Sequence, residues 1–280
     1  MKNLAIRIGA TVAACGVALL LGAPARAADA SPWVEDNYSG IRLITGASQS
    51  SAESLRAGVE IKMQPGWHTY WRYPGDSGVP PRFSFSGSDN VASVKVLYPA
   101  PHAFTDEAGT TIGYKGNVIL PLRVVPLQKD KPVTLRAKID YAVCEKLCVP
   151  VEAKVELTLP PAGGADNAAL DAAEARVPKL VSAAAAGLTA KRASDDKVRP
   201  LVFVDLAAPA GEPVQLFVEG PSTEWALPIP KPAQGAPPGR AHFGFELDGL
   251  PPGVNPKGPF ELTFTIVAGD RATEVKTHLD

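Results

Sequence analysis

The sequence predicts an all-β protein in which a short helical linker joins two β-sandwiches. Two observations carry this prediction. Short runs rich in β-branched and aromatic residues, bounded by Gly, Pro, Asn and Asp, recur over residues 38–161 and again from residue 199. An alanine-rich stretch with high helix propensity separates the two regions. Many short strands spaced by turn residues are typical of an immunoglobulin-like sandwich, which we expect for the first, larger domain.

The first 27 residues have the composition of a secretory signal peptide. Two basic residues precede an apolar stretch that ends at Leu21, and residues 25–27 form an A-x-A cleavage site. We therefore expect cleavage after Ala27 and an exported mature chain without a membrane span, because the apolar run is short for a bilayer. A lipoprotein signal at Cys15 is the alternative, although the most apolar segment follows this cysteine instead of preceding it.

The charge and the thiols of the mature chain limit which partners it can bind and which state its cysteines adopt. Cleavage removes Lys2, Arg7 and Arg26 and no acid, which changes the formal net charge from −1 to −4. A mildly acidic chain without a basic cluster gives no electrostatic reason to bind nucleic acid or anionic lipid. Cys144 and Cys148 are the remaining thiols, and in an oxidising exported compartment two thiols pair unless something reduces them.

Seven segments of the first domain, residues 28–162, are predicted as strands. Apolar and polar residues alternate over 59–63 and 153–159, as expected for strands with one buried and one exposed face. The seven segments are IRLITGA, LRAGVEIKM, TYWRY, ASVKVLY, NVILPLRVV, VTLRAKIDYAV and VEAKVELTL.

Residues 163–195 are predicted as an alanine-rich linker. Pro178 would interrupt one long helix, so one or two short helices are expected there. Strands return over residues 196–280 and predict a second, smaller β-sandwich that contains a proline-rich loop, PIPKPAQGAPPG. The predicted strands of this domain are PLVFVDLA, PVQLFVEG, AHFGFELDGL and PFELTFTIVAG.

The two cysteines lie between strand-like segments and are separated by three residues. A three-residue hairpin loop would place Cys144 and Cys148 opposite each other, with Cα atoms roughly 4.5–5.5 Å apart, which a disulfide can bridge. The pair can be a structural disulfide, a metal site or an exchangeable disulfide. Closing so short a loop stabilises the fold by about 2 kcal/mol at best. None of the four histidines lies at metal-ligand spacing from the pair, so we expect no metal and no cofactor.

Three motifs resemble one family. YAVCEKLCVP (141–150) is similar to the cysteine hairpin of the N-terminal periplasmic domain of the thiol:disulfide interchange protein DsbD. It is still more similar to that of the suppressor-of-copper-sensitivity protein ScsB, in which a C-x-x-x-C-x-P form occurs. PGWHTYWRYPGDSGVPP (65–81) resembles the W-x-x-Y-W-x-x-P-G-D-S-G-x-P pattern of this group, and FTDEAGTTIGYKGNVILPL (104–122) resembles its cap-loop region. The likeness covers about residues 33–161, and the second sandwich resembles an additional domain of the ScsB type.

The resemblance implies an immunoglobulin-like periplasmic domain that passes electrons. In the family, a membrane domain reduces the cysteine pair, which then reduces thioredoxin-fold proteins or factors of cytochrome c biogenesis. By position, Cys148 corresponds to the cysteine that bonds the partner, and Cys144 to the one that resolves the mixed disulfide. This chain contains neither the membrane domain nor the thioredoxin-like domain, so a separate membrane electron donor is expected.

The resemblance also implies residues that line or shield the sulfurs. Alternation places Tyr70 and Trp71 on opposite faces, so part of the aromatic set is expected to fill the core. The family's aromatic pair after the acidic cap-loop residues is replaced here by Ala and Gly, which leaves Phe104 or Tyr114 as a substitute. The candidates are Trp67, Tyr70, Trp71, Asp76, Phe104, Asp106, Glu107, Tyr114 and Lys146.

Two functions of different classes follow. The first is a redox relay through Cys144 and Cys148 with thioredoxin-fold partners. The alternative is a non-catalytic periplasmic binding module for a protein partner or copper, in which the disulfide is permanent. The reduction potential of the pair separates them, because structural bridges have potentials below about −300 mV.

Overall fold

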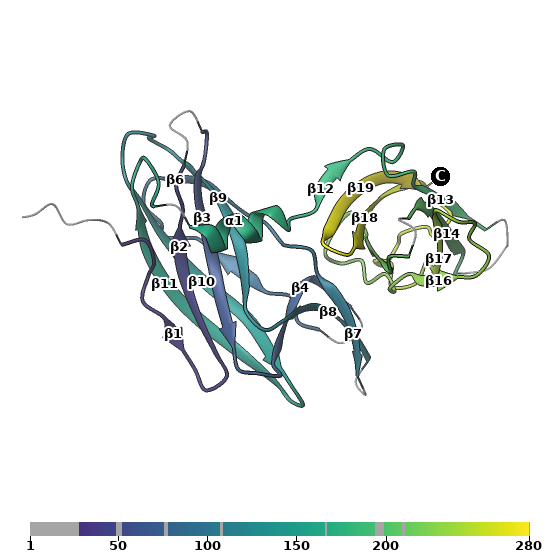
Figure 1. Ribbon diagram of the computed structural model, residues 1–280, viewed down its shortest axis with the longest axis horizontal. Helices are drawn as coiled ribbons and strands as arrows, with labels where there is room; N and C mark the ends of the chain where they lie inside the picture. The colour runs from purple at the N-terminus through teal and green to yellow at the C-terminus, as the bar shows by residue number, and fades with distance from the viewer. Residues whose placement is uncertain are drawn as a thin grey trace, which may run out of the picture.

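The computed structural model describes residues 28–48, 52–75, 78–106, 109–165, 167–193, 199–208 and 211–279. The predicted signal peptide, residues 1–27, lies outside the described residues. Two β-sandwiches lie next to each other, each built from two sheets (Figure 1). The all-β prediction, with an immunoglobulin-like first domain and a second sandwich, is confirmed.

The first sandwich packs a five-stranded sheet against a six-stranded one. The five-stranded sheet has the order β1 (Val34–Glu35), β2 (Ser39–Thr45), β3 (Leu55–Met63), β9 (Val118–Pro126) and β6 (Val91–Val96). The six-stranded sheet has the order β11 (Cys148–Leu159), β10 (Val133–Cys144), β4 (His68–Gly75), β8 (Gly109–Lys115) and β7 (His102–Asp106), and β5 (Arg82–Ser84) pairs with β10.

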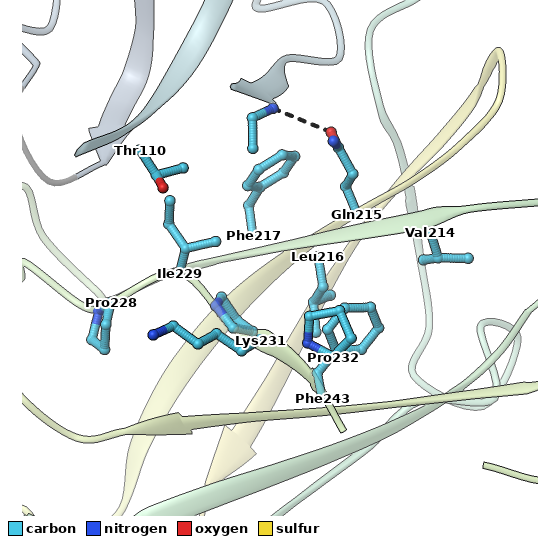
Figure 2. Close-up of a pocket in the computed structure, with 12 residues that line it drawn as sticks. Thr110, Val214, Gln215, Leu216, Phe217, Pro228, Ile229, Lys231, Pro232 and Phe243 are labelled. Atoms are coloured by element: carbon cyan, nitrogen blue, oxygen red, sulfur yellow. Dashed lines mark hydrogen bonds between the residues drawn. The ribbon is translucent and has the colours of Figure 1, made fainter. Parts of the chain in front are cut away.

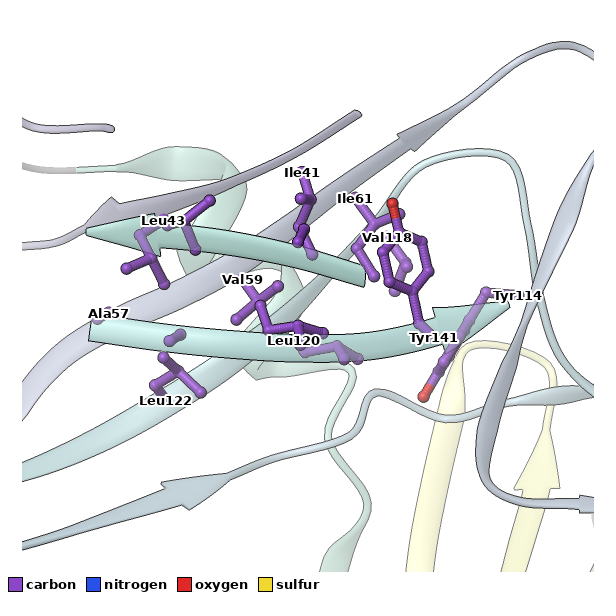
Figure 3. Close-up of a cluster of buried hydrophobic side chains, with 14 of the residues drawn as sticks. Ile41, Leu43, Ala57, Val59, Ile61, Tyr114, Val118, Leu120, Leu122 and Tyr141 are labelled. Carbon is purple, nitrogen blue, oxygen red and sulfur yellow. The ribbon is translucent and has the colours of Figure 1, made fainter. Parts of the chain in front are cut away.

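Alternate residues of these strands form the core between the sheets. Leu43, Val59 and Leu120, from three neighbouring strands, have exposed fractions of at most 1% and point into one cluster (Figure 3). Fully burying an aliphatic side chain of this size stabilises the folded state by about 1.5–3 kcal/mol. The period-two pattern of the sequence therefore sets which face of each strand is buried.

The hairpin β10–β11 positions the two cysteines. Its strands pair in continuous antiparallel register from Val133 opposite Leu159 to Cys144 opposite Cys148. In β11 every second residue from Ala153 to Leu159 is buried, and the residues between them are exposed. One face of the hairpin is therefore anchored in the core, and the loop that joins its strands lies at the end that carries the cysteines.

Most of the described residues of the expected cap-loop region, 104–122, lie in strands: β7 (His102–Asp106) and β8 (Gly109–Lys115) form an antiparallel pair, and residues 118–122 belong to β9. We call β7 and β8 the cap hairpin. β8 pairs with β4, and β7 is the edge strand of the sheet. The cap is therefore an extension of the same sheet that carries the cysteines.

The predicted linker contains one α-helix among its described residues, α1 (Ala168–Ala175). The side chain of Asn167 caps the helix by accepting a hydrogen bond from the Leu170 amide. Arg56 of β3 ties α1 to the first sandwich, because its guanidinium bonds the carboxylates of Asp171 and Glu174, the latter at 3.0 Å. The second alanine run, residues 182–187, forms turns.

The second sandwich packs two four-stranded sheets. Two of its strands, β12 and β13, come from the segment predicted as a linker, so this segment also contributes to the sandwich. One sheet has the order β12 (Lys179–Val181), β19 (Arg271–Leu279), β18 (Phe260–Ala268) and β15 (Val214–Glu219). The other has the order β13 (Thr189–Arg192), β14 (Leu201–Ala207), β17 (Arg240–Glu246) and β16 (Lys231–Ala233).

Candidate active site at the cysteine hairpin

Cys144 and Cys148 form a disulfide, as predicted from export and hairpin spacing. They are the last pair of the β10–β11 ladder, and their Cα atoms lie 4.2 Å apart. Three residues, Glu145 to Leu147, make the loop between them. The close antiparallel pairing of the strands thus brings the two sulfurs within bonding distance.

The two cysteine residues differ sharply in exposure. Cys144 is 2% exposed and packs in a small buried cluster with Tyr70 and Ala142, whereas Cys148 is an exposed residue. Leu147, next to Cys148 in the loop, is 74% exposed. An incoming thiolate therefore reaches the sulfur of Cys148 more easily than that of Cys144, and attack there makes Cys144 the leaving group.

Tyr70 holds both sulfurs. Its hydroxyl oxygen lies 2.8 Å from Sγ of Cys144 and 3.1 Å from Sγ of Cys148. Disulfide sulfurs carry no proton, so the tyrosine hydroxyl is the donor in both contacts. The Tyr70 side chain is 3% exposed, which places this donor in a site nearly free of water. When the bond breaks, the same hydroxyl is in position to donate to the thiolate that forms on Cys144.

A row of paired residues crosses the sheet at the level of the disulfide. His68 of β4 is the direct partner of Cys144, and Lys115 of β8 is the direct partner of His68. Directly paired residues point to the same face of a sheet, so both lie on the disulfide face. Phe104 of the cap hairpin covers this row, with its ring 4.8 Å from the His68 ring and 4.6 Å from Nζ of Lys115.

Sequence reasoning had not placed His68 or Lys115 at the site. For His68 a usable signal was present, because period-two alternation in HTYW puts His68 on the same face as Tyr70. His68 is 6% exposed, and its ring meets the Tyr70 ring edge-on at 5.6 Å. Lys115 had no local signal, since only its pairing across β4 and β8 brings it to this row.

Three aromatic candidates lie elsewhere. Trp71 and Tyr114 are 0% and 4% exposed and belong to the core of the first sandwich, on the face opposite Tyr70. Burial raises the pKa of the Tyr114 phenol well above its ordinary value, and its hydroxyl donates to the carbonyl of Pro99. Trp67 stacks on Tyr38 with ring centroids 4.3 Å apart.

Two of the four polar candidates, Asp106 and Lys146, lie within the described residues. Asp76 and Glu107 lie outside the described residues. Asp106 is the last residue of β7, where its backbone pairs with Gly109. Lys146 is exposed in the loop between the cysteines.

No metal centre emerges from the residues that the structure describes, because no group of three or more His, Cys, Asp or Glu side chains converges there.

Replacing Tyr70 with phenylalanine is expected to raise the pKa of the Cys144 thiol in the reduced protein by about 1–2 units. A hydrogen bond to a charged acceptor contributes about 1.5–3 kcal/mol, and one pKa unit corresponds to about 1.4 kcal/mol. The variant keeps the ring and loses only the hydroxyl that contacts the sulfur. The pKa is read from the ultraviolet absorbance of the thiolate as a function of pH.

Tyr141→Phe is the matched control for this change. Tyr141 is 3% exposed on the same strand as Cys144, and its hydroxyl lies 2.8 Å from Oγ of Ser39, away from the sulfurs. We expect the control to lose stability without moving the thiol pKa. Equal thiol pKa values in Tyr70→Phe and the unmodified protein would contradict the role of the Tyr70 hydroxyl.

Comparison with known proteins agrees with this geometry. Residues 44–160 match the family model described as "Thiol:disulfide interchange protein DsbD, N-terminal". The crystal structure of the N-terminal periplasmic domain of ScsB from Proteus mirabilis superposes with a TM-score of 0.66 at 18% identity, covering 90% of this chain and 98% of that one. A marsupial T cell receptor aligns over 87% of this chain and 98% of its own at 8% identity, with a TM-score of 0.22, which is too low to indicate a shared fold.

No curated protein matches the sequence closely enough to count as a relative. Within the described part of the chain, no helix has both the length and the apolar character needed to cross a membrane. The family match spans nearly the whole first sandwich and contains both cysteines, and the likeness to ScsB extends the shared fold over the second sandwich. Residues 44–160 are therefore identified as a domain of the family described as the N-terminal domain of the thiol:disulfide interchange protein DsbD.

Proposed function

We propose that this chain is a periplasmic thiol:disulfide interchange protein that relays electrons through Cys144 and Cys148. The observation that carries the proposal is a disulfide between one exposed and one buried cysteine, with the hydroxyl of Tyr70 in contact with both sulfurs. The periplasmic location is supported by the signal-like leader, residues 1–27, and by the likeness of the fold to the N-terminal periplasmic domain of ScsB.

The relay consists of two exchange reactions. A donor thiolate attacks Sγ of Cys148, a bond forms between these sulfurs, and the bond to Cys144 breaks, with its electron pair left on Sγ of Cys144. The second thiol of the donor then displaces Cys148, so the donor leaves as a disulfide and the pair is reduced.

In the second reaction, the Cys148 thiolate attacks the disulfide of an acceptor and forms a mixed disulfide. Cys144 resolves it, and the acceptor leaves as a dithiol. A separate membrane protein is the proposed donor, and thioredoxin-fold proteins are the proposed acceptors.

The position of the bridge supports exchange more than stabilisation. It closes a loop of only three residues, for which the chain-entropy contribution is about 2 kcal/mol. The strands that it joins have 12 residues each and are already paired along their whole length. The fold therefore depends little on this covalent bond.

The pair is expected to have a reduction potential well above about −300 mV, the region of inert structural bridges. The potential is measured by equilibrating the mature protein with glutathione and quantifying free thiols. A potential below that region would return the disulfide to a structural role and favour the binding-module alternative.

The double variant Cys144→Ser/Cys148→Ser is the companion measurement. Its free energy of unfolding should fall by no more than about 2 kcal/mol, since that is the whole contribution of so short a loop. A much larger loss would show that the bridge is needed for the fold.

A further inference from the structure

The second sandwich contacts the two elements that carry Tyr70 and Phe104. Figure 1 shows β4, β8 and β7 on the side of the first sandwich that faces the second. Along β4, Tyr70 contacts the sulfurs, and the three residues that follow it contact the second sandwich. The site and the interface between the sandwiches therefore share one short strand.

Arg72 is the main polar contact across this interface. Its guanidinium forms a two-pronged bond with Glu219 of β15, with Nε at 2.9 Å and Nη2 at 2.7 Å, and Nη2 also lies 2.6 Å from Glu274 of β19. Burial alone would lower the pKa of Arg72, but the two carboxylates together outweigh it and raise the pKa above its ordinary value. A two-pronged bond between Arg and a carboxylate fixes orientation as well as distance.

Apolar contacts continue across the same interface. The ring of Trp71 lies 5.8 Å from that of Phe217, and Phe217 and Val267 of the second sandwich belong to the buried cluster of the first. The Tyr73 hydroxyl donates to the carbonyl of Leu227. β4 is thus held by a charged clamp and by packing on both sides of Arg72.

The cap hairpin is held in a similar way. The side-chain oxygen of Gln215 accepts a hydrogen bond from the amide of Ala103, the residue before Phe104, at 3.2 Å. Beside this contact lies a cavity of about 430 Å³, into which Thr110 of the cap hairpin and Phe217 and Ile229 of the second sandwich point (Figure 2). The second sandwich therefore reaches the base of the hairpin that covers the disulfide.

The contacts between the second sandwich and β4 can affect reduction of the disulfide through the Tyr70 hydroxyl. A hydrogen bond to a thiolate is stronger than one to an uncharged sulfur, so Tyr70 in place stabilises the reduced pair more than the disulfide. Such a bond weakens steeply when the geometry is lost, and a reactive group must be held within about 0.5 Å of its productive position. Movement of β4 would therefore lower the tendency of the pair to accept electrons.

We propose that the second sandwich is a positioning domain for the disulfide, and that Arg72 is its positioning residue, acting through Tyr70. The proposal rests on the exchange function given above. It assigns the second sandwich a role in setting the redox equilibrium of a site that it does not itself contain.

The test is a double-mutant cycle with Arg72→Met and Tyr70→Phe. Arg72→Met is expected to lower the equilibrium constant for reduction of the pair by glutathione by about tenfold, the loss of one charge-assisted hydrogen bond. In the Tyr70→Phe background the same substitution should change the constant by less than twofold. Glu274→Gln is the milder variant, because it leaves the bond between Arg72 and Glu219, and it should give a smaller shift in the same direction.

Arg56→Met is the matched control. Arg56 also bridges two carboxylates, Asp171 and Glu174, but it does so at the contact of α1 with the first sandwich. It should lower the melting temperature to a similar extent and leave the glutathione equilibrium unchanged.

The proposal would be overturned if Arg72→Met left the equilibrium constant for reduction by glutathione unchanged; should this variant not fold, Glu274→Gln takes its place. It would also be overturned if Arg72→Met shifted the constant equally with and without the Tyr70 hydroxyl. An equal shift of the constant in the control Arg56→Met would overturn it as well. An unmodified protein whose pair glutathione barely reduces would refute the exchange function instead. In that case the equilibrium constants of the variants, each divided by that of the unmodified protein, would still test whether Arg72 positions Tyr70.

Discussion

Cys144→Ser is expected to accumulate mixed disulfides with partner proteins, and Cys148→Ser is expected to accumulate almost none. In the first variant the exposed Cys148 remains, and no neighbouring thiol is left to displace the partner, so the mixed disulfide persists. In the second variant the remaining thiol is Cys144, which is 2% exposed beneath Tyr70. Diagonal non-reducing electrophoresis of periplasmic extracts that contain each variant measures the difference.

The trapping experiment tests the roles of the two cysteines separately from the exchange function itself. Comparable trapping by both variants would contradict the assignment of Cys148 as the attacking sulfur, although exchange itself would stand. No trapping by either variant would favour a binding module with a permanent disulfide. The double variant Cys144→Ser/Cys148→Ser controls for proteins that bind without a covalent bond.

Trp71→Ala is expected to lower the free energy of unfolding by about 3–5 kcal/mol, the range for removing a large aromatic side chain from a core. Trp71 is 0% exposed and packs both in the first sandwich and against Phe217 of the second. The cavity would therefore open where the two sandwiches meet. Urea unfolding monitored by circular dichroism measures the loss as a shift in the midpoint.

Trp33→Ala is the control for this loss. Trp33 is half-buried, and its ring lies beneath the cationic groups of Arg42 and Lys62, each 4.4 Å from the ring centroid. Cation–π contacts at exposed sites are worth about 0.5–1 kcal/mol each, so the cost should stay below that of Trp71→Ala. Similar costs for the two variants would contradict the central place of Trp71 in the core.

Most of the long strands could be predicted, whereas the shortest ones and the nine-residue strand β19 (Arg271–Leu279) were not. All seven segments predicted in the first domain coincide with strands, because a run of five or more residues shows its period. β1, β5, β12 and β16 have only two or three residues each, and the position of such strands depends on their partners. The cap hairpin was expected as a loop region, since its glycines and threonines give little periodic signal.

The site could be predicted where neighbours in the sequence are neighbours in space. The cysteine hairpin met this condition, and so did the alternation that separates Tyr70 from Trp71. The bond between Arg72 and Glu219 joins residues 147 positions apart, and the bond between Arg72 and Glu274 joins residues 202 apart. No local pattern marks such pairs, because they exist only when the two sandwiches are packed together.

The location of Cys148 at the tip of a long hairpin also bears on how long an encounter with a partner would last. Exchange at Cys148 requires a partner to reach only this cysteine and the three-residue loop beside it, in which Leu147 is 74% exposed. Redox encounters with little buried area, below about 1,200 Å², are typically weak, and weak complexes differ from tight ones mainly in faster dissociation. We therefore expect residence times to be short once the mixed disulfide is resolved. Brief contacts of this kind would suit the proposed relay, in which the cysteine pair meets a donor and an acceptor in turn.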